Sequence, residues 1–228
     1  MDLKAQAAAA ALAYVRNGMT IGLGTGSTTG FFVDLLGEKL KQGELRDIRG
    51  VPTSEKTASR ARALKIPLVS LDDVPELDLV VDGADEVDPQ LDLIKGLGRA
   101  LLREKIVESH TRNFIVVVDE SKLVPKLGKK GPLPVEILPY AAKAHIRWLN
   151  TLGCRAELWL EMDGTPATTD NGNYLAKCWF EDGIPNAYEL AEKLAWRAGI
   201  VEHGLFLRMA SLVIVAGQEG IRILEAKQ

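Results

Sequence analysis

The strongest constraint on the fold is a series of short, continuously apolar segments that alternate with helical patterns over the first two-thirds of the 228-residue chain. A strand without polar alternation is buried on both faces, as in parallel sheets that helices cover from either side. The sequence therefore predicts an α/β fold built on a parallel sheet. The predicted strands are Met19–Leu23, Ile48–Val51, Leu77–Val81 and Phe114–Val118, and the predicted helices lie at 3–15, 31–40, 53–64 and 99–107.

The pattern changes near Lys126, where four of the ten prolines fall within fifteen residues, a composition typical of a domain boundary. Beyond it, apolar and polar residues alternate in Cys154–Met162, and a further strand covers Tyr174–Phe180. Turns of the hairpin type at Asp163-Gly164 and Asn171-Gly172 indicate antiparallel pairing. With helices at 141–152 and 187–198, this block is predicted to be a small α+β domain.

Two final strands, Ser211–Ala216 and Ile221–Leu224, are predicted to return to the first sheet. The expected domains are therefore a main domain of residues 1–128 and 203–228 and an inserted α+β domain of residues 129–202.

Composition excludes several classes of protein. The chain carries 28 Lys and Arg against 31 Asp and Glu, a net charge of −3, which argues against a nucleic-acid-binding surface. Cys154 and Cys178 are too few for a disulfide framework or a zinc cluster and are interpreted as small buried residues. The apolar stretch Ala7–Val15 is too short to span a membrane. We expect a soluble cytoplasmic protein with no nucleic-acid or membrane partner.

A glycine-rich loop, Gly22–Thr28, lies between a predicted strand and a helix. Its backbone N–H groups, the helix N-terminus and the hydroxyls of Thr25, Ser27 and Thr28 can bind a phosphate. A dinucleotide fingerprint would need glycine or alanine at position 27, and a P-loop would need a lysine after the last glycine. The alternative is a tight turn whose serine or threonine caps the helix. Thr53-Ser54, which opens the next helix, is interpreted as a simple N-cap.

Carboxylates crowd the segment Asp82–Asp88, at the carboxyl end of a predicted strand where ligands bind in open α/β sheets. Their mutual repulsion would suit proton transfer. A metal site lacks support because the three histidines are scattered, and a solvated acidic turn is the alternative. The carboxylates are Asp82, Asp85, Glu86 and Asp88, and the histidines are His110, His145 and His203.

Lys95-Gly96-Leu97-Gly98 precedes a predicted helix that carries Glu104. A lysine on a glycine-rich loop can stabilise a developing oxyanion or a phosphate. Glu104 followed by Lys105 could also be ordinary charge on a helix surface. A phosphate loop, paired carboxylates, a loop lysine and a helix glutamate together suit the abstraction of a proton next to a carbonyl on a phosphorylated substrate.

These segments resemble one family, the A-type ribose-5-phosphate isomerases. The resemblance extends in order over nearly the whole chain. It covers residues 24–28, 82–86, 95–98, 104–106, 132–136, 168–173 and 204–206.

The resemblance implies a Rossmann-like parallel sheet domain with an inserted small α+β domain, in a homodimer or homotetramer. It implies interconversion of D-ribose 5-phosphate and D-ribulose 5-phosphate through an enediolate, without metal or organic cofactor. Glu104 would be the general base. Asp82, supported by Asp85, would handle hydroxyl protons and ring opening, and Lys95 would stabilise the enediolate oxygen. The substrate would bind at Thr25, Gly26, Ser27, Thr28, Gly83, Ala84, Gly96, Leu97, Gly98, Lys122 and Lys4.

Two points stay open at this stage. Lys4 and Lys122 match isolated positions, so both could be surface lysines. Leu97 replaces a glycine of the family's usual Lys-Gly-Gly-Gly, and a leucine with positive φ would be strained. An isomerase of another phosphosugar, or a non-catalytic phosphosugar-binding domain, is the alternative. A binding domain would keep the glycine-rich loop without needing Asp82, Lys95 and Glu104 together.

Overall fold

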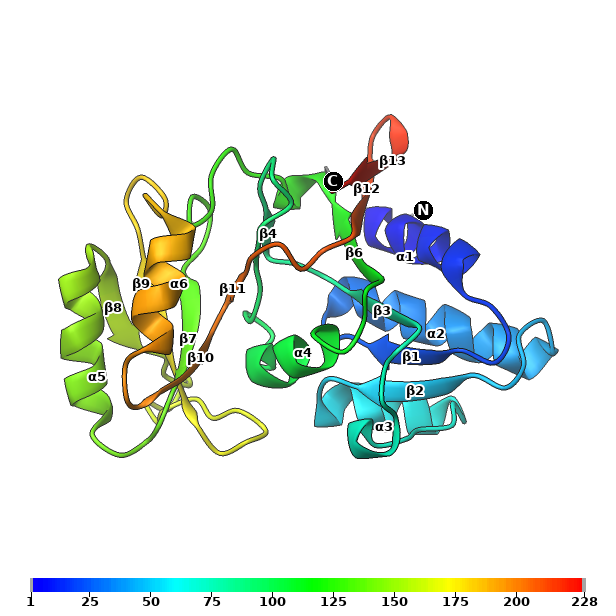
Figure 1. The fold of residues 1–228 in the computed structure, drawn as a ribbon, viewed down its shortest axis with the longest axis horizontal. Coiled ribbons are helices and arrows are strands. Elements are labelled where there is room, and N and C mark those ends of the chain that lie inside the picture. Colours follow the sequence, from blue (N-terminus) through cyan, green and yellow to red (C-terminus); the bar gives the residue numbers. More distant parts are fainter. Residues whose placement is uncertain (1, 227–228) are drawn as a thin grey trace. The chain divides into compact units, whose positions relative to one another are not determined.

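A computed structural model describes residues 2–226, and its element order is drawn in Figure 1. The chain forms two compact units. The first contains the described parts of Met1–Ala84, Arg103–Lys122 and Met209–Gln228, and the second contains Asp85–Leu102 and Leu123–Arg208.

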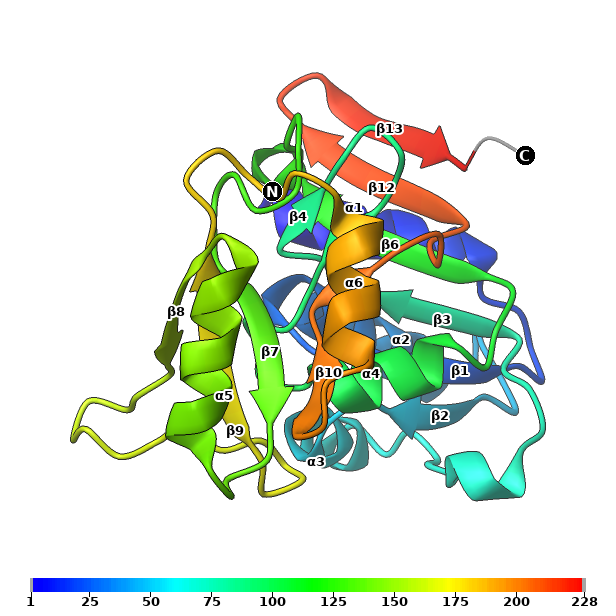
Figure 2. The ribbon, with the colours of Figure 1, turned by 60° about the vertical axis from the view of Figure 1, so that its left-hand side comes forward.

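The first unit is built on a six-stranded sheet, and Figure 2 shows its strands in succession. Its order is β13-β12-β6-β3-β1-β2, with every pair parallel except the edge pair of β12 and β13. The predicted parallel sheet, including the return of the last two strands, is confirmed. The strands are β1 (Thr20–Leu23), β2 (Arg49–Pro52), β3 (Leu79–Asp82), β6 (Phe114–Asp119), β12 (Leu212–Gly217) and β13 (Gly220–Glu225).

Helices α1 (Leu3–Ala11), α2 (Ser27–Gln42), α3 (Glu55–Ala63) and α4 (Leu101–Glu108) belong to the same unit, except that α4 begins at the end of the second. Ser54 caps α3 by accepting a hydrogen bond from the Thr57 amide, as its sequence predicts. Short 3-10 turns cover Leu12–Tyr14, Leu71–Asp73 and Glu120–Lys122. None of the helices formed by residues 2–226 is long and apolar enough to cross a membrane.

Gly22 explains how closely α4 packs on the sheet. A Cβ at this position would lie 2.6 Å from Val80 Cγ2 on β3 and 2.8 Å from Val107 Cγ1 on α4. Only a glycine in β1 leaves room for both side chains. The close approach fixes which face of α4 turns toward the sheet.

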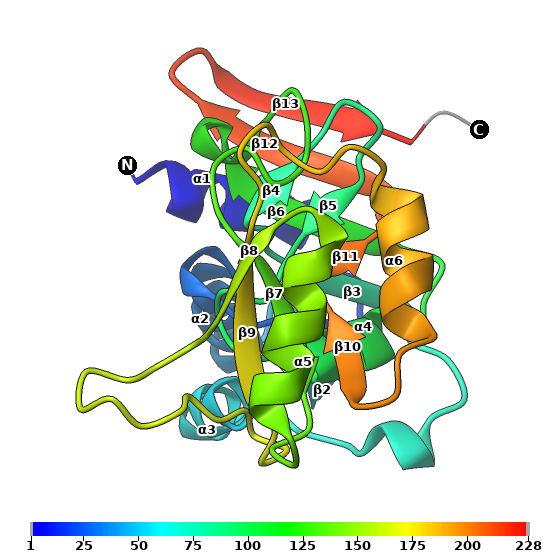
Figure 3. The same ribbon diagram turned by 90° about the vertical axis from the view of Figure 1, so that its left-hand side faces the viewer.

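The second unit contains a four-stranded antiparallel sheet of order β10-β7-β9-β8, and Figure 3 shows α5 (Ala142–Leu149) and α6 (Ala187–Ala195) in front of it. The predicted α+β character of this block is confirmed. A 3-10 turn, Asn150–Leu152, follows α5. The strands are β7 (Leu133–Ile137), β8 (Arg155–Leu158), β9 (Tyr174–Trp179) and β10 (Ile200–His203).

A second, three-stranded sheet pairs β4 (Glu86–Val87), β5 (Leu93–Ile94) and β11 (Leu205–Phe206). This pairing attaches residues 85–102 to the second unit, although they lie between β3 and α4 in the sequence. The compact units therefore differ from the predicted domain boundaries at residues 85–102, 123–128 and 203–208.

Candidate active site

The glycine-rich loop (Gly24–Thr28) connects β1 to α2. The N-cap of α2 is Gly26, which has φ of 145° and makes no side-chain capping hydrogen bond. The alternative in which a serine or threonine caps this helix is therefore wrong. Gly26 and Ser27 are exposed to solvent. An uncapped helix N-terminus beside an exposed hydroxyl is suited to binding an anion.

The hydroxyl of Thr25 joins a cluster of hydroxyls from the start of α3. Its Oγ1 lies 2.7 Å from both Thr53 Oγ1 and Ser54 Oγ, and 3.2 Å from Thr57 Oγ1. Thr57 in turn donates to the carbonyl of Gly24 at 2.9 Å. The side chain of Thr25 thus holds the loop to the neighbouring strand end, while Ser27 stays exposed. Thr57 lies one helical turn after the Ser54 cap, a spacing that could have indicated its contribution.

Asp82 ends β3 and is fully buried. Its Oδ1 accepts hydrogen bonds from the amides of Thr25 at 3.0 Å and Gly83 at 2.6 Å, and from the Thr29 hydroxyl at 3.1 Å. A Cβ at Gly24 would overlap the Asp82 carboxyl group, so this glycine is required. The carboxylate is fixed against the glycine-rich loop, and the alternative of a solvated acidic turn is wrong for Asp82.

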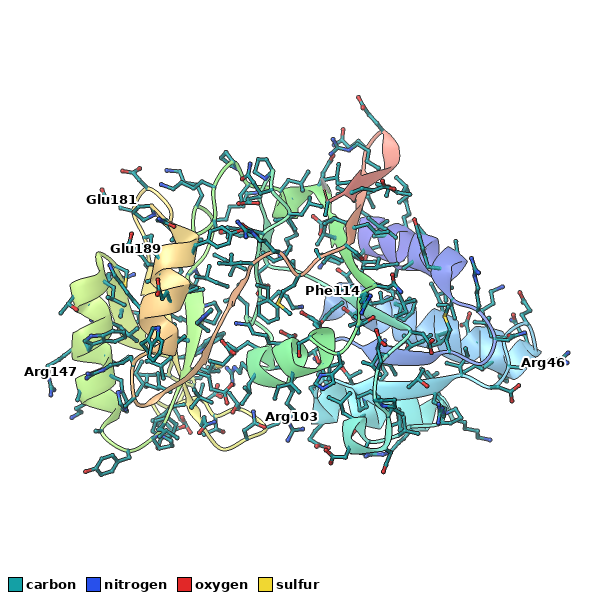
Figure 4. All side chains as sticks on the ribbon, viewed as in Figure 1. Arg46, Arg103, Phe114, Arg147, Glu181 and Glu189 are labelled. Carbon is teal, nitrogen blue, oxygen red and sulfur yellow. The ribbon has the colours of Figure 1, made fainter. Side chains whose placement is uncertain are left out.

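Glu104 lies on α4 and is 2 % exposed. It precedes Val107 by three residues, so both occupy the helix face that packs on Gly22. Its neighbour Arg103, labelled in Figure 4, forms an ion pair with Glu55 at 2.9 Å. The interpretation of Glu104 as ordinary surface charge is wrong, because the structure buries its carboxylate on the inner face of the helix.

Positive charge gathers beside the glycine-rich loop. Lys4 Nζ donates to Ser27 Oγ at 3.1 Å, which places this lysine at the start of α2. Burial by itself raises the pKa of Asp119, but hydrogen bonds from Ser121 and the positive charges of Lys122 and Lys4 bring that pKa below its ordinary value. Both lysines are therefore close to Asp119, which ends β6.

Sequence reasoning missed Asp119. The signal was present, because Asp119 follows the apolar run Phe114–Val118 as Asp82 follows Leu77–Val81. Phe114, labelled in Figure 4, is buried at the start of the same strand. Carboxylates in this position mark the strand ends at which ligands bind in α/β sheets.

In the second unit, the lysine loop (Lys95–Arg99) follows β5. Lys95 is 2 % exposed, and its Nζ lies 5.4 Å from the centre of the Phe206 ring, within cation–π range. Its amide donates to the carbonyl of Gly204 at 2.9 Å. A Cβ at Gly204 would overlap the Lys95 carbonyl oxygen, so a glycine is needed at this close crossing.

The turn after Lys95 uses Gly96 and Arg99 for its unusual backbone. Gly96 has φ of 108°, and Arg99, with φ of 66°, donates its amide to the Gly96 carbonyl at 2.9 Å. Leu97 lies outside the left-handed region, so the sequence departure at this position carries no such strain. The Leu97 amide donates to Asp85 Oδ2 at 2.9 Å, which makes Asp85 a support of the lysine loop.

The other carboxylates of the acidic segment have separate partners. Glu86 is buried and accepts hydrogen bonds from the amides of residues 128, 130 and 131 at 2.6 to 2.9 Å. Burial raises the pKa of Asp88, against hydrogen bonds from the amides of Asp92 and Gln90 that lower it. Glu86 and Asp88 therefore each have hydrogen-bond partners of their own. Within residues 2–226, no group of three or more His, Cys, Asp or Glu side chains is arranged to hold a metal ion.

Comparison with known proteins identifies the family. A model of the family ribose 5-phosphate isomerase A (phosphoriboisomerase A) matches residues 49–220. Ribose-5-phosphate isomerase A of Chloroflexus aurantiacus is 50% identical over 219 residues, 96% of this chain and 91% of that protein. The Pyrococcus horikoshii protein of the same name is 47% identical over 98% of both chains.

Solved structures agree with the sequence comparison. A D-ribose-5-phosphate isomerase in complex with phospho-erythronic acid is 46% identical, covers 98% of both chains and superimposes with a TM-score of 0.95. Ribose 5-phosphate isomerase from Plasmodium falciparum is 38% identical, covers 99% of both chains and also gives 0.95. The chain therefore belongs to the ribose-5-phosphate isomerase A family.

Proposed function

We propose that this chain interconverts D-ribose 5-phosphate and D-ribulose 5-phosphate by proton transfer through an enediolate. The observation that carries the proposal is the match to isomerases of this name over nearly the whole chain. Asp82, Lys95 and Glu104 lie in the segments on which the resemblance to the family rests. We therefore assign the chain the activity of an aldose–ketose isomerase.

In the proposed reaction, Glu104 removes the proton from C2 of the open-chain aldose. The electron pair forms the C1–C2 double bond, and the carbonyl electrons move to O1. Lys95 stabilises the negative charge on the enediolate oxygen. The protonated Glu104 then returns the proton to C1 while the O2 proton moves to O1. Atoms and charge balance, and the carboxylate is regenerated.

Asp82 is proposed to carry the hydroxyl protons and to assist ring opening of the furanose. Its fixed Oδ1, bonded to the Thr25 and Gly83 amides, supports this role because the carboxylate cannot rotate freely. Asp85 is proposed to assist through the lysine loop, whose Leu97 amide it holds.

The phosphate is proposed to bind at the start of α2. The uncapped N-terminus at Gly26, the exposed Ser27 and the nearby ammonium of Lys4 support this assignment. Lys122 adds positive charge through its position beside Asp119. The remaining proposed substrate contacts are Thr25, Thr28, Gly83, Ala84, Gly96, Leu97 and Gly98.

We also propose a cytoplasmic homodimer or homotetramer, as the resemblance implies. Light scattering on the purified protein would measure the mass of the assembly against the 24.8 kDa chain. A monomer at the concentration of the activity assay would contradict this proposal.

The test of function is turnover of D-ribose 5-phosphate by the purified chain in the presence of EDTA, followed as ketose formation. We expect activity with the chelator present, and solvent deuterium at C1 of the ketose when the reaction runs in D₂O. The C2 epimer D-arabinose 5-phosphate is the control sugar. Absence of turnover would contradict the isomerase assignment, and activity abolished by EDTA alone would contradict the cofactor-free mechanism.

A further inference from the structure

Arg99, the last residue of the lysine loop, is held by side chains from the antiparallel part of the second unit. Its guanidinium donates two hydrogen bonds to the carboxylate of Glu161, one of them from Nη2 to Oε2 at 3.1 Å. It also lies 5.0 Å from the centre of the Trp159 ring. A planar guanidinium that pairs with a carboxylate through two bonds has a fixed orientation as well as a fixed position.

The contacts of the Arg99 side chain matter because its backbone adopts a left-handed conformation. A φ of 66° lies in the left-handed region, which is unfavourable for a residue with a side chain. The lysine loop contains two glycines, yet this left-handed position is occupied by an arginine. The contacts of the Arg99 side chain therefore lie where the unfavourable backbone conformation joins the loop to α4.

Arg99 also closes the turn that follows Lys95. Its amide donates to the Gly96 carbonyl, and this hydrogen bond fixes the distance between the first and last residues of the turn. On the other side, the Lys95 amide is bonded to the Gly204 carbonyl. The backbone of Lys95 is thus held from the strand side by Gly204 and from the helix side through Arg99.

We propose that Arg99, clamped by Glu161 and Trp159, is a positioning residue for Lys95 in the isomerase reaction. The inference rests on the proposed function, because it concerns where the Lys95 ammonium lies when charge develops on the enediolate oxygen. Arg99 acts through the turn that ends at its own amide. A misplacement of a catalytic group by about 1 Å costs on the order of 10²-fold in rate, so a loosened turn has a measurable effect.

The ion pair is poorly suited to a purely stabilising role. The side chains of Arg99 and Glu161 are 33% and 40% exposed, and exposed ion pairs contribute little to folding stability. The hydrogen bond from Arg99 lowers the pKa of Glu161, so the pair is charged throughout the neutral range. Loss of the pair is therefore expected to change the reaction more than the stability.

The chain supplies a matched control. Arg155 on β8 donates to Glu157 at 2.7 Å and lies 5.7 Å from the centre of the Trp179 ring. It has the same three side-chain types in the same kind of contact, but it lies outside the lysine loop. Arg155→Met removes this second cluster without touching the turn.

The experiment compares Arg99→Met, Arg99→Lys and Arg155→Met, with Lys95→Met as a second background. With D-ribose 5-phosphate, Arg99→Met should lower kcat by about tenfold or more and change KM little. Arg99→Lys should recover part of the loss because an ammonium retains the charge but not the paired hydrogen bonds. Arg155→Met should keep the wild-type kcat.

The decisive measurement is the double variant. If Arg99 acts through Lys95, Arg99→Met lowers kcat in the wild type and has no further effect when Lys95 is already Met. Affinity for phospho-erythronic acid, measured by titration calorimetry, should fall in Arg99→Met more than in Arg155→Met.

Equal losses in both Lys95 backgrounds, or an unchanged kcat in Arg99→Met, would overturn the positioning role. If Arg99→Lys lost kcat and its unfolding midpoint also fell well below that of the wild type, the positioning role would be overturned. The loss of kcat would then follow from reduced stability. If the wild type and Arg155→Met turn over no D-ribose 5-phosphate, the proposed function itself is wrong. These outcomes are distinguishable, because the three that overturn the positioning role all require an active wild type.

Discussion

In the first unit, Asp82 is held mainly by backbone amides at the ends of neighbouring parallel strands, whereas the lysine loop of the second unit is held in part by the side chains of Asp85 and Glu161. Asp82 Oδ1 accepts bonds from three groups within its own strand-end environment. The lysine loop instead depends on Gly204, Asp85 and Glu161. Both Asp82 and Lys95 are buried, so burial alone does not distinguish the two parts.

The surroundings of Asp82 and those of Lys95 differ in how they would respond to a substitution. The carboxylate of Asp82 is enclosed by backbone, and a change there must move the loop or the strand. The lysine loop also depends on the side chains of Asp85 and Glu161, and one substitution can remove either contact. We therefore expect substitutions around Asp82 to act by steric overlap. Substitutions around the lysine loop should act by letting Lys95 move from its position.

The largest expected effect tests proton transfer in the first unit. Glu104→Gln removes the base while keeping the shape of the side chain, so kcat should fall by about 10²–10⁴-fold with substrate binding retained. Loss of deuterium exchange at C2, followed by NMR, is the measurement. Glu108→Gln is the matched control, since Glu108 is also 2 % exposed on α4 but has no proposed role. A near-normal rate for Glu104→Gln would show that another group is the base.

The next effect tests charge stabilisation in the second unit. Lys95→Met keeps the length of the side chain and its contact with Phe206 but removes the ammonium, so kcat should fall by about 10²–10³-fold. Steady-state kinetics measures it. Lys177→Met, which removes an ammonium 4.2 Å from the Trp159 ring, is the control and should remain within a few-fold of wild type. Equal losses in the two variants would remove the special role of Lys95.

A third effect tests the enclosure of Asp82. Gly24→Ala would place a Cβ against the Asp82 carboxyl group, and we expect a loss of about 1–3 kcal/mol in the free energy of unfolding, together with loss of activity. Denaturant unfolding measures the change. Gly83→Ala is the control, because the nearest atom to its added Cβ is Thr29 Oγ1 at an ordinary 3.6 Å. If both variants lose the same amount, overlap at Gly24 is not the cause.

The smallest expected effect concerns the lysine loop. Leu97→Gly should lower the free energy of unfolding by only about 0.5–1 kcal/mol, from added freedom in the unfolded chain, since Leu97 is 36% exposed and unstrained. Its amide can still bond to Asp85. Unfolding curves and kcat together test this expectation. A loss larger than that of Gly24→Ala would reverse the comparison between the two loops.

The sequence is sufficient to predict the part of the fold in which local pattern and tertiary structure agree. Buried parallel strands appear as apolar runs, and the glycine-rich loop and Asp82 follow such runs directly. Asp119 also follows an apolar run directly, but it was missed because only the acidic segment Asp82–Asp88 was considered in the sequence. Predicted strand and helix ends are displaced from the observed ones by a few residues, as for the strand predicted at 154–162, of which β8 covers Arg155–Leu158.

The second unit was harder to predict because its short strands and side-chain contacts leave no periodic pattern in the sequence. The proline-rich boundary contains β7, an inner strand, and Pro134 is tolerated there because β10 pairs only with Val135–Ile137. The Pro134 carbonyl accepts from Gly204 instead. The strands β4, β5 and β11 have two residues each, too few for a periodic pattern. Nothing in the local sequence indicates that Arg99 finds Glu161, 62 residues away.

The division of the chain between the two units also determines when each can fold. The chain passes from one unit to the other at residues 84/85, 102/103, 122/123 and 208/209. The strand β12, which follows the second unit's residues in the sequence, pairs with β6 inside the first unit's sheet. A growing chain that has not yet released β12 from the ribosome exposes the edge of β6, a surface prone to wrong pairing. The first unit's sheet is therefore complete only after residues 85–102 and 123–208 of the second unit have been synthesised.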